Sequence, residues 1–238
     1  MQEMSRLKTK DVQSDMYDKA YFEWGIESGV SLYQNYRWMP ELTIPMTMTI
    51  IDFLGIKRNQ TVLDFGCAKG YVVKALRLLY RQAYGVDCSE YAIENVDPCV
   101  EDYCALKSGP VYVNVKHGFP RSFDHCIAKD VFEHLSVCEL SEELYVLPSD
   151  RVFAIIPLGS NGKYRAPAND LDVTHIICKD ELWWEYFFEK QGWHVRDMRL
   201  YLPGIKDHYY EKYPESHGFF TLKRRERKFS GKSIHSMG

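Results

Sequence analysis

The sequence predicts one α/β domain built on an open sheet, and three observations support this fold class. A β-prone apolar run over residues 61–65 passes through small residues into a run with helical spacing of apolar side chains. Two later strand patterns, residues 83–87 and 123–130, each end in an aspartate. Residues 151–157 are almost wholly apolar, which is typical of a central strand covered on both faces.

The composition excludes several classes of protein. With 238 residues, 45% hydrophobic and 26% charged, the chain is expected to be soluble, globular and able to bury a sizeable core. A net charge of −3 gives no general reason to expect a nucleic-acid partner. No apolar run reaches the length of a membrane span, and residues 1–10 are too polar for a secretory signal, so a cytoplasmic protein is expected. The seven cysteines contain no C-x-x-C pair, so we expect neither a disulfide framework nor a metal site.

The turn after the first strand is the strongest candidate for a ligand site. Gly66, Ala68 and Gly70 keep side chains small, so that backbone N–H groups can approach a ligand at the start of the following helix. Asp64 stands at the strand's end, where a carboxylate can meet a cationic or hydroxyl-bearing ligand. The spacing therefore predicts a nucleotide-like ligand at the carboxyl edge of the sheet.

Acidic residues also end the next two strands. Asp87 falls 21 residues after Gly66, where an acidic side chain can accept hydrogen bonds from both ribose hydroxyls of an adenosine-containing ligand. Ser89 then begins a short helix as its N-cap. Asp130 ends the strand of residues 123–130, and the segment directly beyond it, residues 131–135, is expected to face the same crevice.

The first 44 residues carry a dense aromatic segment between Tyr17 and Trp38. Two interpretations stay open: a cap that packs onto the domain, or a lid over the ligand in which Tyr36 and Arg37 make polar contacts. A helix over residues 45–54 is expected to follow, with Gly55 ending it.

Residues in the second half of the chain are expected to contact the substrate. Residues 158–172 form a long loop rich in Gly, Asn, Pro and Asp, and such loops at the functional edge are often substrate loops. An aromatic helix over 179–191 and strands over 193–202 and 218–222 follow, and residues 223–238 form a basic tail expected to be frayed. A further strand is expected at 111–115.

These motifs together resemble a family. Residues 63–70 are similar to the first motif of class I S-adenosylmethionine-dependent methyltransferases of type 11 or 12, an acidic residue followed by G-x-G-x-G, with Ala68 in place of the middle glycine. Residues 85–87 resemble the second motif, whose acid binds the ribose, and residues 130–135 resemble the segment that lines the crevice near the methyl group. The resemblance spans about residues 45–222, with Asp172 and His175 in its later part.

The resemblance implies a Rossmann-like seven-stranded, mostly parallel sheet with strand order 3-2-1-4-5-7-6, an antiparallel last strand and helices on both faces. The expected parts are an N-terminal cap (1–44), a methyltransferase domain (45–222) and the tail (223–238). The family's adenine contact follows the third strand, but residues 116–119 depart too far from the pattern for an assignment.

The implied activity is in-line transfer of a methyl group from S-adenosylmethionine, leaving S-adenosylhomocysteine, to a small molecule or sugar, with an oxygen as the expected acceptor atom. Such an oxygen would gain from a general base, for which His175 and His134 are the candidates. The expected cofactor-binding residues are Asp64, Gly66, Cys67, Ala68, Gly70, Asp87, Cys88, Lys129, Asp130, Tyr36 and Arg37. The expected substrate-binding residues are Tyr164, Arg165 and Asp172.

Two alternatives remain beside a methyltransferase. An NAD-dependent oxidoreductase shares the glycine turn, but its third glycine would come one residue later, and Asp64 would repel a pyrophosphate. A non-catalytic protein that binds S-adenosylmethionine, a sensor or partner subunit, would carry the same motifs, because they report binding rather than turnover. The sequence does not indicate an oligomeric state.

Overall fold

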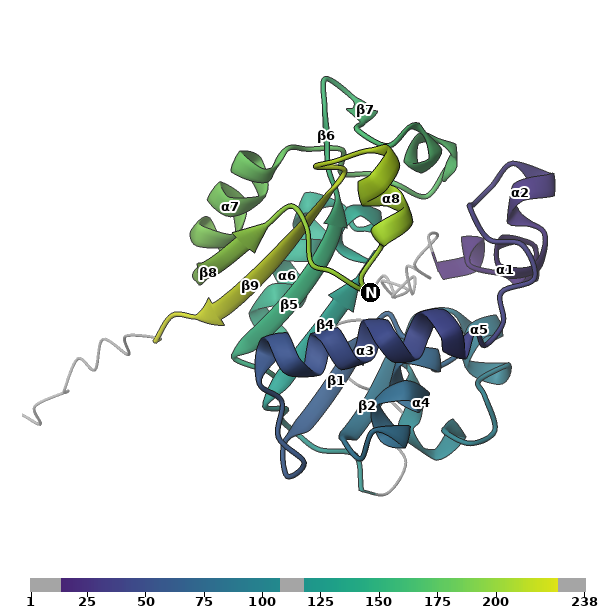
Figure 1. The fold of residues 1–238 in the computed structure, drawn as a ribbon, viewed down its shortest axis with the longest axis vertical. Helices are drawn as coiled ribbons and strands as arrows, with labels where there is room; N and C mark the ends of the chain where they lie inside the picture. The colour runs from purple at the N-terminus through teal and green to yellow at the C-terminus, as the bar shows by residue number, and fades with distance from the viewer. Residues whose placement is uncertain (1–13, 108–117, 227–238) are drawn as a thin grey trace, which may run out of the picture.

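The computed structural model describes residues 14–107 and 118–226, which fold into a seven-stranded sheet with helices on both faces (Figure 1). The strand order is β3-β2-β1-β4-β5-β9-β8, and β9 alone runs in the direction opposite to the other six strands of this sheet. The predicted order and the antiparallel last strand are therefore confirmed. The strands are β1 (Thr61–Phe65), β2 (Gln82–Asp87), β3 (Cys104–Leu106), β4 (His125–Lys129), β5 (Arg151–Pro157), β8 (Trp193–Arg199) and β9 (His217–Arg224).

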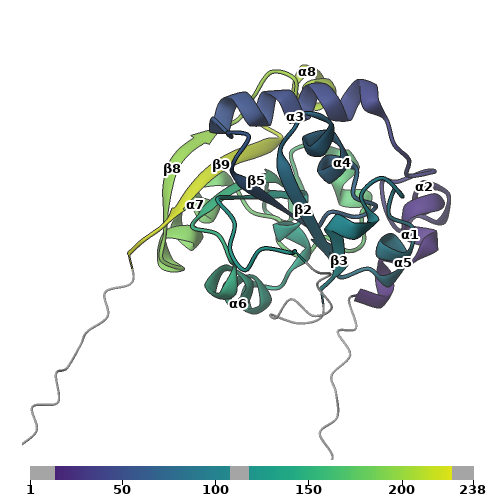
Figure 2. The same cartoon turned by 90° about the horizontal axis from the view of Figure 1, so that it is seen from below.

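The two faces of the sheet are covered by different helices, which Figure 2 shows above and below the strands. The period-2 alternation of β1 explains the division: Val62 joins the core with α3 and α4, while Leu63 and Phe65 join the core with α6 and α7. The helices are α3 (Pro40–Leu54), α4 (Tyr71–Leu78), α5 (Glu90–Glu94), α6 (Val137–Val146), α7 (Glu181–Lys190) and α8 (Asp207–Lys212). None of the described helices is long and apolar enough to cross a membrane.

The N-terminal segment packs as an aromatic cap beside the carboxyl ends of the central strands (Figure 1). It contains two short helices, α1 (Lys19–Glu23) and α2 (Gly25–Ser28). Tyr21 and Phe22 are buried, and they pack against Ala92 of α5. The long loop predicted over 158–172 contains a small hairpin, β6 (Gly159–Ser160) with β7 (Lys163–Tyr164), and a 3₁₀ turn, η4 (Pro167–Leu171).

The predicted start of the third helix was wrong. α3 begins at Pro40 rather than Pro45 and carries Pro45 inside it. Pro40 occupies the first helical position, where a missing N–H costs nothing, whereas Pro45 removes one interior hydrogen bond. Two prolines could each mark a helix start, and the structure uses the first of them, although the buried residues of α3 all follow Pro45.

Two predicted element boundaries in the sheet differ from the observed ones. The third strand, β3, occupies Cys104–Leu106, which sequence patterning missed, and the predicted strand at 111–115 lies outside the described residues. The tail was predicted to begin at Lys223, but Lys223 and Arg224 are paired in β9. Arg224 stays in the sheet because its guanidinium donates to Asp150 (3.0 Å) and to the Leu147 carbonyl oxygen (2.6 Å).

Candidate active site

The glycine turn after β1 is held against the end of β2. The backbone N–H groups of Gly66 and Cys67 donate to the Val86 carbonyl oxygen, at 2.8 and 3.0 Å. Gly66 has φ +81°, and a Cβ there would lie 2.4 Å from the Val131 side chain. Position 66 therefore requires glycine, while Ala68 accepts a φ of +47° in the same turn.

Asp87 lies at this turn, as the spacing predicts. Its carboxylate accepts from the Ala68 N–H (2.7 Å) and the Ser89 N–H (2.8 Å), and burial raises its pKa. A carboxylate offers about four acceptor positions, so these backbone contacts do not use all of them. Asp87, Gly66, Ala68 and Cys88 line a cavity of about 380 Å³ beside the turn, which we call the turn cavity.

Three predicted cofactor residues face the core instead of a cavity. Asp64 is only 3% exposed, and burial raises its pKa to about 7, an effect that nearby Lys129 opposes. Cys67 packs against Gly85, and a Cβ on Gly70 would approach Cys104 and Val100. These residues shape the turn from beneath.

A second cavity, of about 770 Å³, adjoins the turn cavity and is called here the acceptor cavity. The two cavities share Tyr21, Tyr33, Asp130 and His134 as lining residues, so they lie side by side, and we call the pair the crevice. The other predicted site residues that line the acceptor cavity are Tyr36, Arg37, Lys129, Asp172 and His175. The volumes of the two cavities fall in the range of about 300–1,000 Å³ that is usual for small-molecule sites.

Asp130 forms a charged cluster where the two cavities meet. Its carboxylate pairs with the Nζ atoms of Lys129 (2.6 Å) and Lys206 (2.9 Å). Burial alone would raise the pKa of Asp130, but the two ammonium groups hold it below its ordinary value. Asp130 is thus a stable anion at this point, and it compensates one of the two lysine charges.

The two candidate histidines lie beside each other, with ring centroids 4.6 Å apart. His175 Nδ1 lies 2.8 Å from the Asn169 carbonyl oxygen, which only accepts, so this nitrogen carries the proton. His134 Nδ1 lies 2.8 Å from Thr174 Oγ1, which itself donates to Asp172 (2.5 Å). Both rings therefore have their lone pair on Nε2.

Burial keeps both imidazoles neutral. It lowers the pKa of His134 to about 4, an effect to which neighbouring His175 adds, and it also lowers the pKa of His175. Neutral imidazoles can accept a proton or coordinate a cation. The structure thus brings together the two histidines that the sequence singled out.

The aromatic cap connects the two sides of the crevice. Lys69, in the turn, forms an ion pair with Glu23 of α1 and donates to the Tyr36 carbonyl oxygen (3.0 Å). On the far side, the Tyr21 hydroxyl donates to Asp172 (3.0 Å). The cap therefore spans from the glycine turn to the segment that carries His175.

Two predicted substrate residues do not line either cavity. The Tyr164 hydroxyl donates to the Ile177 carbonyl oxygen (3.0 Å), and its ring packs beside His175 with centroids 5.0 Å apart. Arg165 points to Glu181 and to the Glu215 carbonyl oxygen. Tyr164 supports His175 from behind, and Arg165 anchors the hairpin.

Sequence reasoning missed Glu133 and Lys206, which both line the acceptor cavity. Glu133 is fully buried, and within residues 14–107 and 118–226 neither of its carboxylate oxygens has a hydrogen-bond partner. Glu133 could have been found from the sequence, because it lies in residues 131–135, the segment after a strand end from which His134 was chosen as a candidate. No short motif marks Lys206, which reaches Asp130 from the loop before α8.

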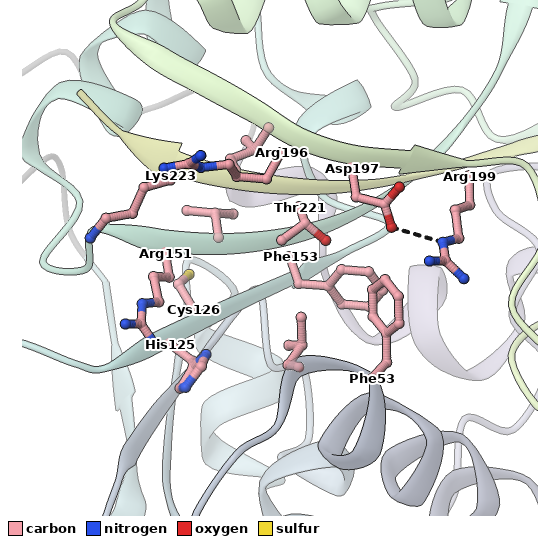
Figure 3. Close-up of a pocket in the computed structure, with 13 residues that line it drawn as sticks. Phe53, His125, Cys126, Arg151, Phe153, Arg196, Asp197, Arg199, Thr221 and Lys223 are labelled. Carbon is pink, nitrogen blue, oxygen red and sulfur yellow. Dashed lines mark hydrogen bonds and ion pairs between the residues drawn. The ribbon is translucent and has the colours of Figure 1, made fainter.

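A third cavity, of about 560 Å³, lies at the opposite edge of the sheet (Figure 3). His125 and Arg151, at the amino ends of β4 and β5, line it together with Arg196 and Lys223. Ligands of open α/β sheets bind at the carboxyl ends of the strands, so this cavity is separate from the cofactor site.

The sheet order, the glycine turn and the acid that ends β2 are those of the Rossmann-like methyltransferase fold. Residues 40–144 match a family described as a methyltransferase domain. No curated protein gives a significant match to the sequence.

Solved structures share the fold at low sequence identity. The methyltransferase in complex with the Trm112 methyltransferase activator of Haloferax volcanii is 14% identical, with a TM-score of 0.57 over 79% of this chain and 92% of that one. The 1,6-didemethyltoxoflavin-N1-methyltransferase of Burkholderia thailandensis is 16% identical (TM-score 0.53; 79% and 81%). The methyltransferase domain of bacterial CtHen1-CN is 20% identical (TM-score 0.52; 76% and 99%).

Proposed function

We propose that the protein transfers a methyl group from S-adenosylmethionine, held in the turn cavity, to a hydroxyl oxygen of a small molecule or sugar held in the acceptor cavity. The observation that carries the proposal is the junction of the two cavities at Tyr21, Tyr33, Asp130 and His134. A sulfonium methyl group at this junction would face an acceptor on the other side. Such collinear placement of nucleophile, carbon and leaving sulfur supplies up to roughly 7–11 kcal/mol of barrier reduction.

The residues at the junction support a cationic donor and an oxygen acceptor. Tyr21 and Tyr33 offer aromatic surface to the sulfonium, whose positive charge disperses in the transition state. Asp130 and its two lysine partners would lie near the charged methionine end of the cofactor, and Asp87 would hold the ribose. The Nε2 lone pairs of His175 and His134 would be the groups that accept a proton lost by the acceptor during transfer.

The test uses purified full-length protein, methyl-labelled S-adenosylmethionine and a panel of sugars, nucleotide sugars and phenols. Labelled O-methyl product together with S-adenosylhomocysteine is the expected result. Cofactor binding without transfer to any hydroxyl acceptor in the panel would overturn the proposed acceptor class and favour a non-catalytic binding protein.

The ribose contact is tested separately with Asp87→Asn. We expect the Kd for S-adenosylmethionine to rise at least about tenfold, because hydrogen bonds to a charged group contribute about 1.5–3 kcal/mol each. Asp52→Asn removes an exposed carboxylate on α3 and should leave the Kd unchanged. Equal Kd values for the Asp87→Asn variant and the wild type would contradict the assignment of Asp87.

A further inference from the structure

Glu133 presents an electrostatic problem that the described protein groups do not solve. Its side chain is fully buried in η3 (Phe132–His134) and lines the acceptor cavity, and neither oxygen has a hydrogen-bond partner among the residues that the structure describes. A buried carboxylate without partners is costly, and proteins resolve the cost by protonation or by a bound cation. The neighbouring ammonium groups of Lys129 and Lys206 are engaged by Asp130.

Glu133 has two imidazoles beside it. One ligand atom from each of Glu133, His134 and His175 can be chosen so that all three lie within 4.8 Å of one another. His134 Nε2 is 3.9 Å from Glu133 Oε1. Ligand atoms on one ion, each about 2.0–2.2 Å from it, lie about 3–3.5 Å apart. Small side-chain rotations would therefore bring the three ligand atoms to the distances that one ion requires.

The surroundings orient both imidazoles for coordination. Metal-binding histidines usually donate their other ring N–H to an oxygen acceptor, which fixes the tautomer and the ring plane. His175 does so toward the Asn169 carbonyl oxygen, and His134 does so toward Thr174, which is backed by Asp172.

The backbone locks the two contributing segments together. The Glu133 carbonyl oxygen accepts from the Ile176 N–H (2.7 Å) and the Ile177 N–H (2.9 Å). This contact joins η3 to the segment that carries His175, so the three side chains are held in one rigid arrangement.

We propose that Glu133, His134 and His175 bind a divalent first-row transition-metal ion at the wall of the acceptor cavity. Two imidazoles and one carboxylate suit such ions and leave coordination positions open toward the cavity. Asp130 is not assigned as a ligand, because its carboxylate pairs with Lys129 and Lys206 and compensates one of their two positive charges.

The inference rests on the proposed function for the role of the metal. An acceptor hydroxyl bound to the ion would have a lowered pKa and lose its proton to water. The oxygen would then form a bond to the methyl carbon as the carbon–sulfur bond breaks, and the sulfur would take the electron pair and become neutral S-adenosylhomocysteine. His134 and His175 would act through the metal rather than as general bases.

The test measures binding of Mn²⁺ and Co²⁺ to the full chain after chelator treatment, without S-adenosylmethionine or acceptor. Titration calorimetry should give one site per chain, and Co²⁺ should develop a visible absorption band. Glu133→Gln and His175→Asn should each weaken binding by more than the roughly 10–100-fold that is lost when a group hydrogen-bonded to a metal ligand is removed. His208→Ala removes an exposed imidazole from the same cavity and serves as the matched control.

The outcomes separate the metal site from the methyltransferase activity. Added metal should raise the Tm of the wild type and of His208→Ala, but not of Glu133→Gln. Absence of binding by the wild type, or equal binding by Glu133→Gln and His175→Asn, would overturn the metal site. The binding assay contains no S-adenosylmethionine, so that result would leave the proposed methyl transfer standing. Metal binding without O-methylation would contradict only the proposed function.

Discussion

Asp64 shows how a motif residue can act through burial rather than contact. It belongs to the segment that resembles the first motif of the family, yet its side chain is 3% exposed and lines neither cavity. Burial raises its pKa from 3.8 to about 7, so the folded state holds a proton that the unfolded chain has already lost. The residue therefore couples the stability of the turn to pH.

We predict that this coupling appears as a loss of stability between about pH 4 and pH 7. The pKa is higher in the folded state, so the contribution of Asp64 is complete below the unfolded pKa of 3.8 and disappears as pH rises through about 7. At 1.36 kcal/mol per pKa unit, the loss in free energy of unfolding is at most roughly 4 kcal/mol.

Urea unfolding of Asp64→Asn across this pH range should show a correspondingly flatter profile than the wild type. Asp52→Asn, which alters an exposed carboxylate, should keep the wild-type slope. An unchanged slope in Asp64→Asn would show that other groups carry the pH dependence.

The aromatic cap is held at both sides of the crevice by different kinds of interaction. Near the turn, the Lys69–Glu23 ion pair and the Tyr91 hydroxyl (2.9 Å from Glu23 Oε1) hold α1. On the acceptor side, the Val173 N–H donates to the Val30 carbonyl oxygen (3.2 Å), and Tyr21 donates to Asp172. Because the cap bridges both cavities, its closure should depend on the acceptor-side contacts without unfolding the domain.

We predict that Tyr21→Phe loosens the cap selectively. Removing the donor leaves a buried Asp172 oxygen with one hydrogen bond fewer, at a cost of about 1–3 kcal/mol. Hydrogen exchange of the α1 and α2 amides should accelerate, while exchange in β1 and β4 should not change. Tyr33→Phe is the matched control, since the Tyr33 hydroxyl makes no hydrogen bond to a described residue; equal acceleration in both variants would assign the effect to aromatic packing.

Cofactor binding should stabilise the entire domain, because the turn cavity is built from β1, β2 and the segment after β4 together with the cap. A ligand at 100 times its Kd adds about 2.7 kcal/mol to the free energy of unfolding. For a domain of this size, that corresponds to a rise in Tm of roughly 5–11 °C.

We therefore predict that saturating S-adenosylhomocysteine raises Tm by this amount, measured by differential scanning calorimetry. NAD⁺ at the same concentration is the control, and it should leave Tm unchanged, because the glycine spacing departs from the dinucleotide fingerprint. A comparable shift with NAD⁺ would contradict the cofactor assignment.

The sheet and the ligand turn were predictable because their determinants are local. Asp87 follows Gly66 by a spacing that one crossover helix imposes, and β1 and β5 have the bounds that their apolar runs indicate. The third strand was missed because a run of only three residues, Cys104–Leu106, carries too little periodicity. The start of α3 was misplaced because either proline satisfies the local rule for a first helical position.

The arrangement of the crevice needed the tertiary structure. Asp64 and Asp87 are both strand-end carboxylates, and only the packing shows that one lies in the core and the other at a cavity. His134 and His175 are 41 residues apart, and the hydrogen bonds of the Glu133 carbonyl oxygen bring their segments together. The local sequence thus determines which ligand the turn can hold. Contacts between distant segments determine which side chains line the acceptor cavity, because those contacts depend on where the loops and the cap pack.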